Sequence, residues 1–217
     1  MDNLENPSQI ILRQQRLLSN NIMLVCPKAD SLVLKLSDIQ GSSAKISALC
    51  WDYSSYMQQS QNAQASFSIH PPKDWQPRQI IIFMPKSKDL LPFIFAAIAQ
   101  KLAGAEKIWL VGGKREGVES AAKNFAKQVA GKALLEKDQQ KGPGGALKLD
   151  SARHCQLWQI NAQDFAINNT EKYWRHMTWQ ISGIGNISIS SLPGVFSFGR
   201  LDPGTKLLLD CLPDGSQ

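Results

Sequence analysis

The sequence predicts an α/β fold in which helices cover both faces of a doubly wound, mostly parallel sheet. Two segments in the middle of the chain, Gln79 to Met84 and Lys107 to Val111, are short unbroken apolar runs, which is typical of strands buried on both faces. Each run is followed by a segment with helical periodicity, at residues 89–103 and 117–130. The chain has 217 residues, of which 43% are hydrophobic and 19% charged. This is enough for one large domain, or for one domain with an appendage.

The segment before residue 79 shows the same alternation of helix and strand less clearly. Pro7 and Ser8 are start signals for a first helix. The tract 54–64 is polar and biased in composition, so it is either a solvent-facing helix or a loop. The other expected elements are a helix at 6–18, a strand at 22–25, a helix at 30–36 and a strand at 45–51.

The segment after residue 130 contains turn signals and β patterns. The glycines and the proline of residues 139–145 predict an exposed loop, and residues 155–160 predict a strand. Residues 173–192 alternate apolar and polar side chains around two glycines, which predicts a hairpin. An aspartate followed by a proline at 202–203 is the pattern of an N-cap and a first helical residue, so we expect a helix over 201–212.

Positive charge is concentrated in the middle of the chain. The formal net charge is +6, from 24 Lys and Arg against 18 Asp and Glu. Residues 80–154 contain 13 basic and 7 acidic residues, so this window carries the whole excess and the remainder balances. Clustered Lys and Arg gain free energy by displacing counterions from phosphates, which favours a polyanionic partner. A solvated, lysine-rich surface without a partner is the alternative.

Four basic residues follow the ends of the two central strands. They are Lys86, Lys88, Lys114 and Arg115. Open α/β sheets bind ligands at the carboxyl ends of their strands, so these side chains are candidates for holding phosphates. The alternative is a loop whose lysines only add solubility. The glycine-rich turn at 112–117 lacks the features of a dinucleotide or Walker motif, which leaves anion binding at a helix N-terminus or a plain turn.

Several other classes of site are not expected. The four cysteines lie far apart without a C-x-x-C pair and only three histidines are present, so we expect neither a disulfide framework nor a metal site. The chain has no Ser-His-Asp order and no G-x-S-x-G motif, so it shows no nucleophilic catalyst. The six tryptophans mostly fall in predicted strands, which favours a place in the core over base stacking.

The sequence also bears on location. It begins with MDNLE, which lacks the positive patch and the apolar stretch of a signal peptide. The longest apolar run, at 90–99, is interrupted by Pro92 and has about half the length that a membrane span needs. We therefore expect a cytoplasmic protein with no membrane partner.

The C-terminal segment resembles a known family. Residues 192–213, LPGVFSFGRLDPGTKLLLDCLP, are similar to the bacterial ribosomal RNA small subunit methyltransferase C family, which reads G-V-F-S, a short spacer and L-D-x-G-[ST]-x-L-L-L. MPKSK at 84–88, VGGKREGVESA at 111–121 and LDSARHC at 149–155 are similar to the N-terminal half of that family. The resemblance covers most of the chain from Ile80 onward and, more loosely, its beginning.

The resemblance implies a tandem duplication of a class I, Rossmann-like methyltransferase domain. In such enzymes the C-terminal copy binds S-adenosylmethionine and methylates the exocyclic N2 of a guanine in 16S ribosomal RNA, whereas the N-terminal copy has lost the cofactor loop. This chain resembles the degenerate copy: Cys26 to Ala29 stand where glycines would be, and Met84-Pro85-Lys86 stand where the active copy has Asn-Pro-Pro-Phe. Methionine, proline and lysine cannot accept from the guanine amino group or stack on a flipped base. The resemblance therefore places S-adenosylmethionine in the full-length enzyme, with none expected in this chain.

The same resemblance implies a division of the chain. Residues 1–186 are expected to form the degenerate methyltransferase-like domain. Residues 187–217 are expected to be a linker and the first helix of a catalytic domain that this chain does not contain.

The function expected on this basis is recognition of 16S ribosomal RNA, or of the small ribosomal subunit, together with scaffolding of the protein's own catalytic domain. The candidate contacts to the RNA backbone are Lys86, Lys88, Lys114, Arg115 and Arg153. One alternative is a purely structural domain that stabilises the catalytic half and has no direct role in RNA binding. Another is a free-standing enzyme that uses S-adenosylmethionine.

Overall fold

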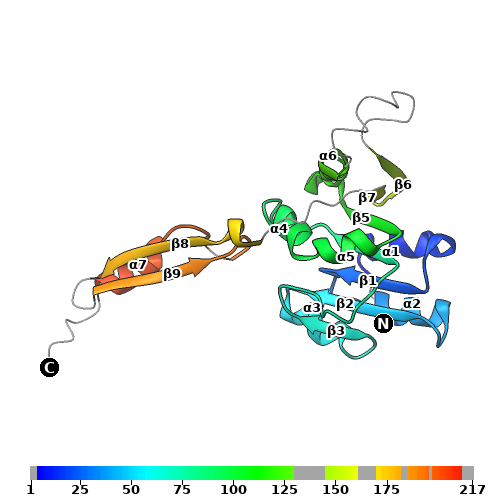
Figure 1. Cartoon of the computed structure of the whole chain (residues 1–217), viewed down its shortest axis with the longest axis horizontal. Helices are drawn as coiled ribbons and strands as arrows, with labels where there is room; N and C mark the ends of the chain where they lie inside the picture. Colours follow the sequence, from blue (N-terminus) through cyan, green and yellow to red (C-terminus); the bar gives the residue numbers. More distant parts are fainter. Residues whose placement is uncertain (1–3, 130–144, 161–169, 182–184, 196, 212–217) are drawn as a thin grey trace.

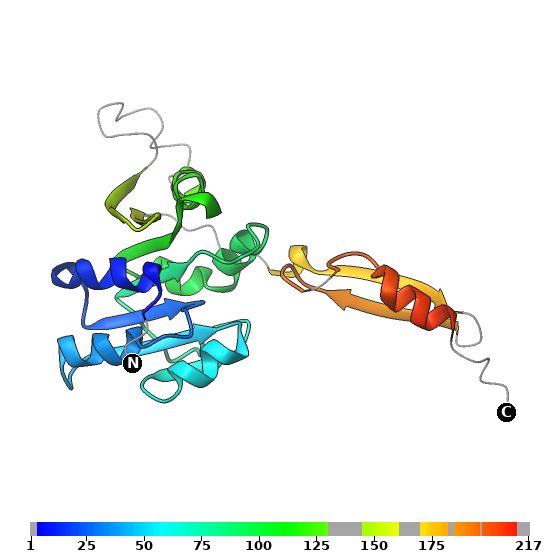
Figure 2. The same ribbon diagram turned by 180° about the vertical axis from the view of Figure 1, so that it is seen from behind.

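The chain forms a body built on one large sheet and an arm made of a hairpin and a helix (Figures 1 and 2). This computed structural model describes residues 4–129, 145–160, 170–181, 185–195 and 197–211. The arm extends away from the body in both views. The loop expected at 139–145 lies outside the described residues apart from its last position.

The sheet of the body has seven strands in the order β3-β2-β1-β4-β5-β7-β6. Strands β1 to β5 are parallel to one another, whereas β7 is antiparallel to both of its neighbours, β5 and β6. The strand order reverses between β1 and β4, which is the switch point of a doubly wound sheet. The predicted fold class is therefore confirmed. The strands are β1 (Asn21–Val25), β2 (Lys45–Cys50), β3 (Gln64–Phe67), β4 (Gln79–Phe83), β5 (Lys107–Gly113), β6 (Ala146–Ala152) and β7 (Cys155–Ile160).

The side chains of the central strands alternate between two cores, one on each face of the sheet. In β1, Met23 and Val25 enter one core while Ile22 and Leu24 enter the other, and all four are fully buried. Strands β4 and β5 follow the same period of two. Unbroken apolar runs in the sequence therefore correspond to strands that are covered on both faces.

Helices cover both cores. Helices α4 (Leu90–Ala97), α5 (Ala99–Gly104) and α6 (Val118–Val129) supply buried side chains to the core that contains Met23. Helices α1 (Asn6–Arg13) and α2 (Leu32–Gln40) supply the core that contains Ile22. Helix α3 (Tyr53–Gln59) packs beside β2 and β3 at the edge of the sheet (Figure 1). The short 3₁₀ turn η1 (Gln15–Leu17) completes the first predicted helix.

The single helix predicted over 89–103 is wrong, because α4 and α5 are separate helices that meet at Ile98. The chain tightens there: the Lys101 N–H donates to the Ile98 carbonyl three residues earlier at 2.9 Å. Lys101 is 9% exposed, and its ammonium donates to the backbone carbonyls of Lys73 at 2.8 Å and Trp75 at 2.5 Å. A buried ammonium requires such acceptors, and this requirement fixes the last turn against the segment before β4.

Two edge strands were not predicted. Strand β3 includes the end of the polar tract 54–64 and pairs only with β2. Strand β6 precedes the predicted strand at 155–160 and forms an antiparallel hairpin with it. Both strands have exposed or half-buried side chains, so neither gives the continuous apolar signal of the central strands.

The arm begins after the body. It consists of the 3₁₀ turn η4 (Thr170–Tyr173), the antiparallel hairpin of β8 (Arg175–Ile181) and β9 (Gly185–Ser191), and helix α7 (Pro203–Asp210), which lies along the hairpin in both views (Figures 1 and 2). The predicted hairpin and C-terminal helix are confirmed. Residue 186, the expected domain boundary, lies within β9.

The base of the arm contacts α4. The ring of Tyr173 packs edge-on against Phe93, with a centroid distance of 5.6 Å. Gly194 has a φ of +92° and lies over Leu90, where a Cβ would come within 3.0 Å of the leucine side chain. The arm therefore rests on the helix that follows the carboxyl end of β4.

Candidate nucleic-acid interface at the carboxyl edge of the sheet

The carboxyl ends of the parallel strands lie at one edge of the sheet, which faces the arm (Figure 2). We call this side the carboxyl edge. The turn between β6 and β7 reaches the same edge, because Cys155 at the start of β7 pairs with Gly113 at the end of β5. The loops that leave β4 and β5 and the β6–β7 turn carry the five basic residues chosen from the sequence: Lys86, Lys88, Lys114, Arg115 and Arg153.

Lys86 lies on the exposed loop that leaves β4. Its charge reaches the loop after β2, where the pKa of the Asp52 carboxyl is lowered, mainly by the hydroxyl of Ser54 and the N–H of Ser55 and to a smaller extent by Lys86. No described carboxylate forms a salt bridge with Lys86.

Lys88 lies over the start of α6. A Cβ on Gly117, which has a φ of +78°, would come within 3.1 Å of the Lys88 Nζ. Lys88 also lines a cavity of about 280 Å³ between α4 and α6, whose wall includes the stacked rings of Phe95 and Phe125. The ammonium is therefore held at the mouth of an otherwise largely apolar hollow.

Lys114 and Arg115 are exposed in the 3₁₀ turn η2 (Lys114–Glu116) that follows β5. The Gly113 N–H donates to the Glu116 carboxylate at 2.6 Å, and the Lys114 N–H donates to the His154 carbonyl at 2.8 Å. The protein's own carboxylate thus takes the place at this turn where an anion would bind. The geometry favours the plain turn over the anion site, with the two basic side chains left facing outward.

Arg153 occupies the tip of the β6–β7 turn with a φ of +48°. Its guanidinium donates to the side-chain carbonyl of Gln9, and its backbone carbonyl accepts from the Asn6 side chain at 3.5 Å. Arg153 is therefore already engaged with α1, whereas the described part of the chain forms no salt bridge with the other four candidates.

Cys26 follows β1 at the position where the resemblance predicts a glycine. Its φ is +52°, in the left-handed region that glycine adopts most easily. Burial, together with the nearby Cys50 thiol, raises the pKa of Cys26 to about 12, against a smaller opposing effect of Lys28. The backbone thus has the conformation of a glycine turn but carries a side chain.

The loop after Cys26 is tied to α3. The hydroxyl of Ser55 donates to the Pro27 carbonyl at 2.7 Å, and the amide of Gln59 donates to the Lys28 carbonyl at 2.6 Å. Ser55 and Gln59 are 3% and 1% exposed. These internal bonds and the Cys26 side chain remove the bare backbone that close approach to an adenosyl group requires, so these residues do not fit S-adenosylmethionine.

The end of β4 is closed in a similar way. Met84 is buried against Gly112 of β5, so closely that a Cβ on Gly112 would lie 2.5 Å from the Met84 Cβ. The Met84 thioether has no amide or carbonyl to offer to a base amino group, and Gly112 has no side chain. The described part of the chain also holds no cluster of three or more His, Cys, Asp and Glu side chains suited to a metal ion.

Sequence reasoning missed two features of this edge. Lys28 is a further basic residue there, 4.0 Å from the Glu5 carboxylate. A row of aromatic rings also runs from Trp51 over Phe93 to Tyr173, with centroid distances of 5.2 and 5.6 Å. Only contacts between distant segments reveal this row, so spacing in the sequence carried no signal for it.

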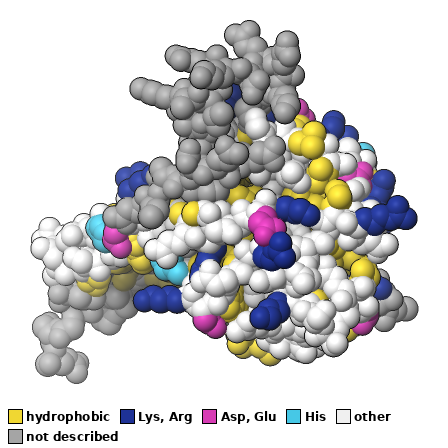
Figure 3. Space-filling model, turned by 45° about the vertical axis from the view of Figure 1, so that its right-hand side comes forward, with side chains coloured by type: hydrophobic (Ala, Val, Ile, Leu, Met, Phe, Trp, Pro, Cys, Tyr) yellow, Lys and Arg dark blue, Asp and Glu magenta, His cyan; other side chains and the backbone are white. Residues whose placement is uncertain are grey.

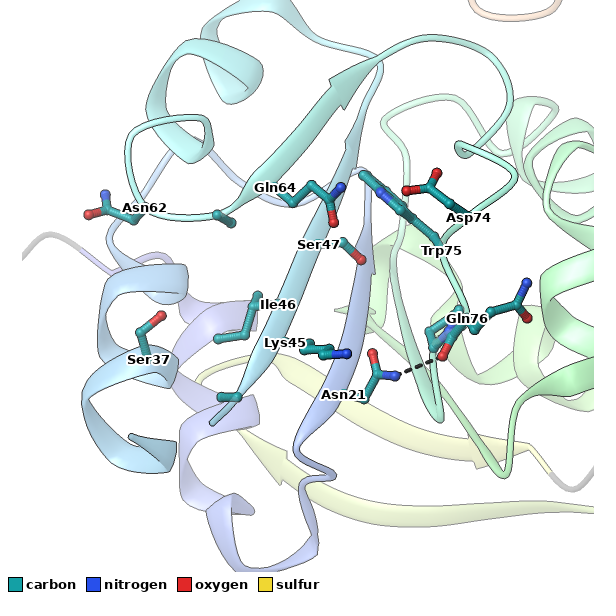
Figure 4. A pocket seen from close by; sticks show the side chains of 13 residues that line it. Asn21, Ser37, Lys45, Ile46, Ser47, Asn62, Gln64, Asp74, Trp75 and Gln76 are labelled. Atoms are coloured by element: carbon teal, nitrogen blue, oxygen red, sulfur yellow. Dashed lines mark hydrogen bonds between the residues drawn. The ribbon is translucent and has the colours of Figure 1, made fainter. Parts of the chain in front are cut away.

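The largest described cavity, about 670 Å³, lies at the opposite, amino-terminal edge of the sheet (Figure 4). Lys45, Ser47 and Gln64 line it at the starts of β2 and β3. On its other side the Asn21 amide donates to the Gln76 carbonyl at 2.7 Å. None of the five candidate residues borders this cavity.

Positive charge is not confined to the carboxyl edge. On the face of the molecule that Figure 3 shows, Lys and Arg side chains are scattered and separated by uncharged and hydrophobic surface. On the exposed surface Arg78 is paired with Glu106, with its Nε and Nη2 atoms at 2.8 and 3.0 Å from the carboxylate oxygens. The case for an interface therefore depends on the place and pairing of particular residues more than on net charge.

The fold is that of Rossmann-like methyltransferases. The structure resembles the 16S rRNA N2 G1207 methyltransferase of T. thermophilus, solved in complex with AdoMet and guanosine, with a TM-score of 0.63 and 15% sequence identity over 96% of this chain and 52% of that one. At this level of identity the likeness concerns the fold alone.

The chain belongs to the family described as methyltransferase small domain N-terminal, which it matches over residues 8–177. It is 37% identical over 218 residues to the ribosomal RNA small subunit methyltransferase C of Hahella chejuensis, covering 99% of this chain and 58% of that protein. The corresponding protein of Acinetobacter baylyi is 36% identical over 207 residues, which are 94% of this chain and 55% of that protein. The chain thus spans a little over half the length of these relatives. None of its described helices has the length and apolar character needed to cross a membrane.

Proposed function

We propose that this chain is the non-catalytic N-terminal domain of a 16S ribosomal RNA guanine-N2 methyltransferase and that its carboxyl edge contacts the RNA backbone. In this proposal Lys86, Lys88, Lys114 and Arg115 supply most of the contact. Arg153, on the β6–β7 turn at the same edge, contributes less because its guanidinium already donates to Gln9.

The observation that carries the proposal is the pairing state of these side chains. Within the described residues, none of the first four forms a salt bridge, and all four are exposed. Exposed cations at one edge gain free energy from phosphate contacts and fix the register of an RNA without reading its sequence.

The contacts around Cys26 and Met84 support a catalytic site that lies outside this domain. The loop after β1 is bonded to α3, and β4 ends in a buried methionine where the catalytic motif would need an amide. We infer that S-adenosylmethionine and the target guanine bind the other half of the full-length enzyme. Residues 1–186 would then form the degenerate domain, and residues 187–217 would lead into the catalytic one.

A structural role in the same enzyme is the second candidate. Helix α7 exposes Leu207 by 65% and Leu208 by 71%, and adjacent leucines at such exposure are expected to be covered by another apolar surface. In this alternative the domain stabilises the catalytic half and contributes no RNA contact.

The RNA role is tested by the salt dependence of binding. The affinity of this chain for a full-length 16S ribosomal RNA transcript is measured by filter binding over a series of salt concentrations. The double variant Lys86→Ala/Lys114→Ala should weaken binding and reduce the slope of log K against log salt by about 1.4 to 1.8, since each lost phosphate contact removes about 0.7 to 0.9.

The matched control removes the same charge from the opposite edge. Lys45 and Lys127 are exposed at the start of β2 and near the end of α6, so Lys45→Ala/Lys127→Ala should leave the slope unchanged. If the two double variants change the slope equally, the attraction to RNA is non-specific. If the unmodified chain does not bind the transcript, the proposed RNA role is wrong.

The structural alternative is tested in the full-length enzyme. If it holds, Leu207→Ser/Leu208→Ser lowers the unfolding temperature of the enzyme while RNA affinity and its salt slope stay the same. If RNA contact is the domain's role, Lys86→Ala/Lys114→Ala raises the KM for RNA without changing the unfolding temperature.

A further inference from the structure

Three aromatic side chains form an exposed cluster at the outer end of the carboxyl edge. Tyr53, Tyr56 and Phe67 lie in mutual contact, with ring centroids 5.7 to 6.1 Å apart. Tyr53 is 60% exposed and Phe67 is 53% exposed. We call these residues the aromatic triad.

The triad is not part of either core. It is formed by α3 and by the edge strand β3, and none of its members belongs to the buried clusters on the two faces of the sheet. Large apolar side chains at this exposure contribute little to folding, and a contiguous exposed group of them commonly marks a binding surface.

The triad lies at the same edge of the sheet as the basic residues. Phe67 is the last residue of β3 and pairs in register with Cys50 at the end of β2, while Tyr53 opens α3 directly after Asp52. Lys86 follows the end of β4, which is parallel to β2 and β3 and so ends at the same edge of the sheet. Three strand spacings, or about 14 Å, separate β3 from β4 in the sheet. One short single strand of nucleic acid can reach both.

The carboxylate of Asp52, which directly precedes Tyr53, does not strongly oppose the approach of a phosphate. Asp52 caps α3 by accepting from the Ser55 N–H at 3.0 Å and from the hydroxyl of Ser54. Its negative charge is thus directed to the helix N-terminus, where a carboxylate is stabilised.

We propose that the aromatic triad is a stacking platform for unpaired bases of an RNA whose phosphates follow Lys86 and Lys88. This inference rests on the proposed function and adds to it the form of RNA recognised, a single-stranded segment. Aromatic rings beside lysines are the combination that binds single strands, since every base has a π face that can stack.

The size of the patch favours a base over a protein partner. Fully burying an aromatic side chain removes about 150 to 250 Å² from solvent, so these partly exposed rings offer about 300 Å² in total. A stable protein interface needs about 800 Å² from each partner. The triad is therefore too small for a second copy of the chain but suits one or two bases.

The test compares two RNA ligands of equal charge. The affinity of this chain for a fluorescein-labelled oligoadenylate of twelve residues is measured by anisotropy, alongside that for an abasic strand of the same length. The unmodified chain should bind oligoadenylate at least about fivefold more tightly than the abasic strand. Tyr53→Ala/Phe67→Ala should lose this difference and keep its salt slope, and Tyr53→Phe/Phe67→Tyr should restore it.

The matched control is Met57→Ala/Ile69→Ala, which removes exposed aliphatic side chains from α3 and from the segment just after β3. It should not change the preference for bases. Circular dichroism of every variant checks that the fold is retained.

The outcomes separate this inference from the proposed function. If Lys86→Ala/Lys114→Ala weakens binding to both strands while the triad variant binds oligoadenylate normally, the platform is wrong and the basic interface stands. If the unmodified chain binds neither strand nor the 16S transcript, the stacking platform and the basic interface are both wrong. If sedimentation shows a dimer that Tyr53→Ala/Phe67→Ala dissolves, the triad is a protein contact and the platform is wrong.

Discussion

Replacing Gly112 by alanine should destabilise the body of the protein. The new Cβ would lie 2.5 Å from the Cβ of Met84 and closer still to its Cγ. Met84 is 4% exposed, and its Cβ is fixed by the backbone of the loop after β4, so the clash cannot be relieved by rotating the side chain alone. The strand β5 or the loop that carries Lys86 must move instead.

The magnitude follows from two opposing effects. Overpacking a close-packed site costs about 1 to 3 kcal/mol. Replacing glycine by alanine also lowers the conformational entropy of the unfolded chain, which stabilises the folded state by about 0.4 to 1 kcal/mol. The midpoints of these ranges leave a net loss of about 1.3 kcal/mol, which corresponds to a fall in the unfolding temperature of about 3 to 5 °C for a chain of this size.

The neighbouring glycine provides the control. A Cβ on Gly113 would meet only the Glu116 side chain, at 3.2 Å or more, and that side chain can shift by a few tenths of an ångström. Gly113→Ala should therefore leave the unfolding temperature within about 2 °C of the unmodified chain. Thermal unfolding followed by circular dichroism measures both variants. Equal stability of Gly112→Ala and Gly113→Ala would refute the close packing of Met84 on β5.

Four further predictions concern other parts of the chain. The Asp202 carboxylate caps α7 by accepting from the Thr205 N–H at 2.9 Å, so Asp202→Ala should lower the stability of this helix by about 1 kcal/mol. Lower helical ellipticity or faster amide exchange in α7 would show the loss. Burial raises the pKa of Cys26 to about 12, so Cys26 should resist iodoacetamide at about pH 8 while the exposed Cys211 reacts. Peptide mass spectrometry would show which cysteine is modified, and early modification of Cys26 would contradict this prediction. An unfolded cysteine thiol ionises near its ordinary pKa of 9.0, so the stability that the neutral Cys26 thiol contributes is complete below that pH and is lost as the pH rises toward 12. Cys26→Ser should therefore flatten alkaline denaturation curves. Arg78 and Glu106 pair on the open surface, so Arg78→Met should not shift the urea midpoint measurably, and a clear shift would show a structural role.

The fold was predictable where burial on both faces forced continuous apolar sequence. Strands β1, β4 and β5 lie in the centre of the sheet, and their side chains enter both cores. The edge strands β3 and β6 have mostly exposed or half-buried side chains, which resemble those of loops in composition. The break between α4 and α5 depends on Lys101 reaching backbone carbonyls far away in sequence, and no local pattern encodes it.

The candidate site was predictable to a similar extent. Parallel strands place their carboxyl ends together, so the convergence of Lys86 and Lys114 followed from the fold class. The engagement of Arg153 with Gln9 did not, because it depends on how α1 packs beside the β6–β7 turn. The aromatic triad was hidden for another reason: the tract that contains Tyr53 and Tyr56 is polar in composition, and its partner Phe67 lies on a strand that was not predicted.

The base of the arm covers part of the helix that follows the loop between β4 and α4. Tyr173 and Gly194 contact α4 through Phe93 and Leu90, and that helix starts two residues after Lys88. Removing the Tyr173 ring would therefore uncover part of Phe93, which is now 2% exposed, on the helix that adjoins the lysines of this loop.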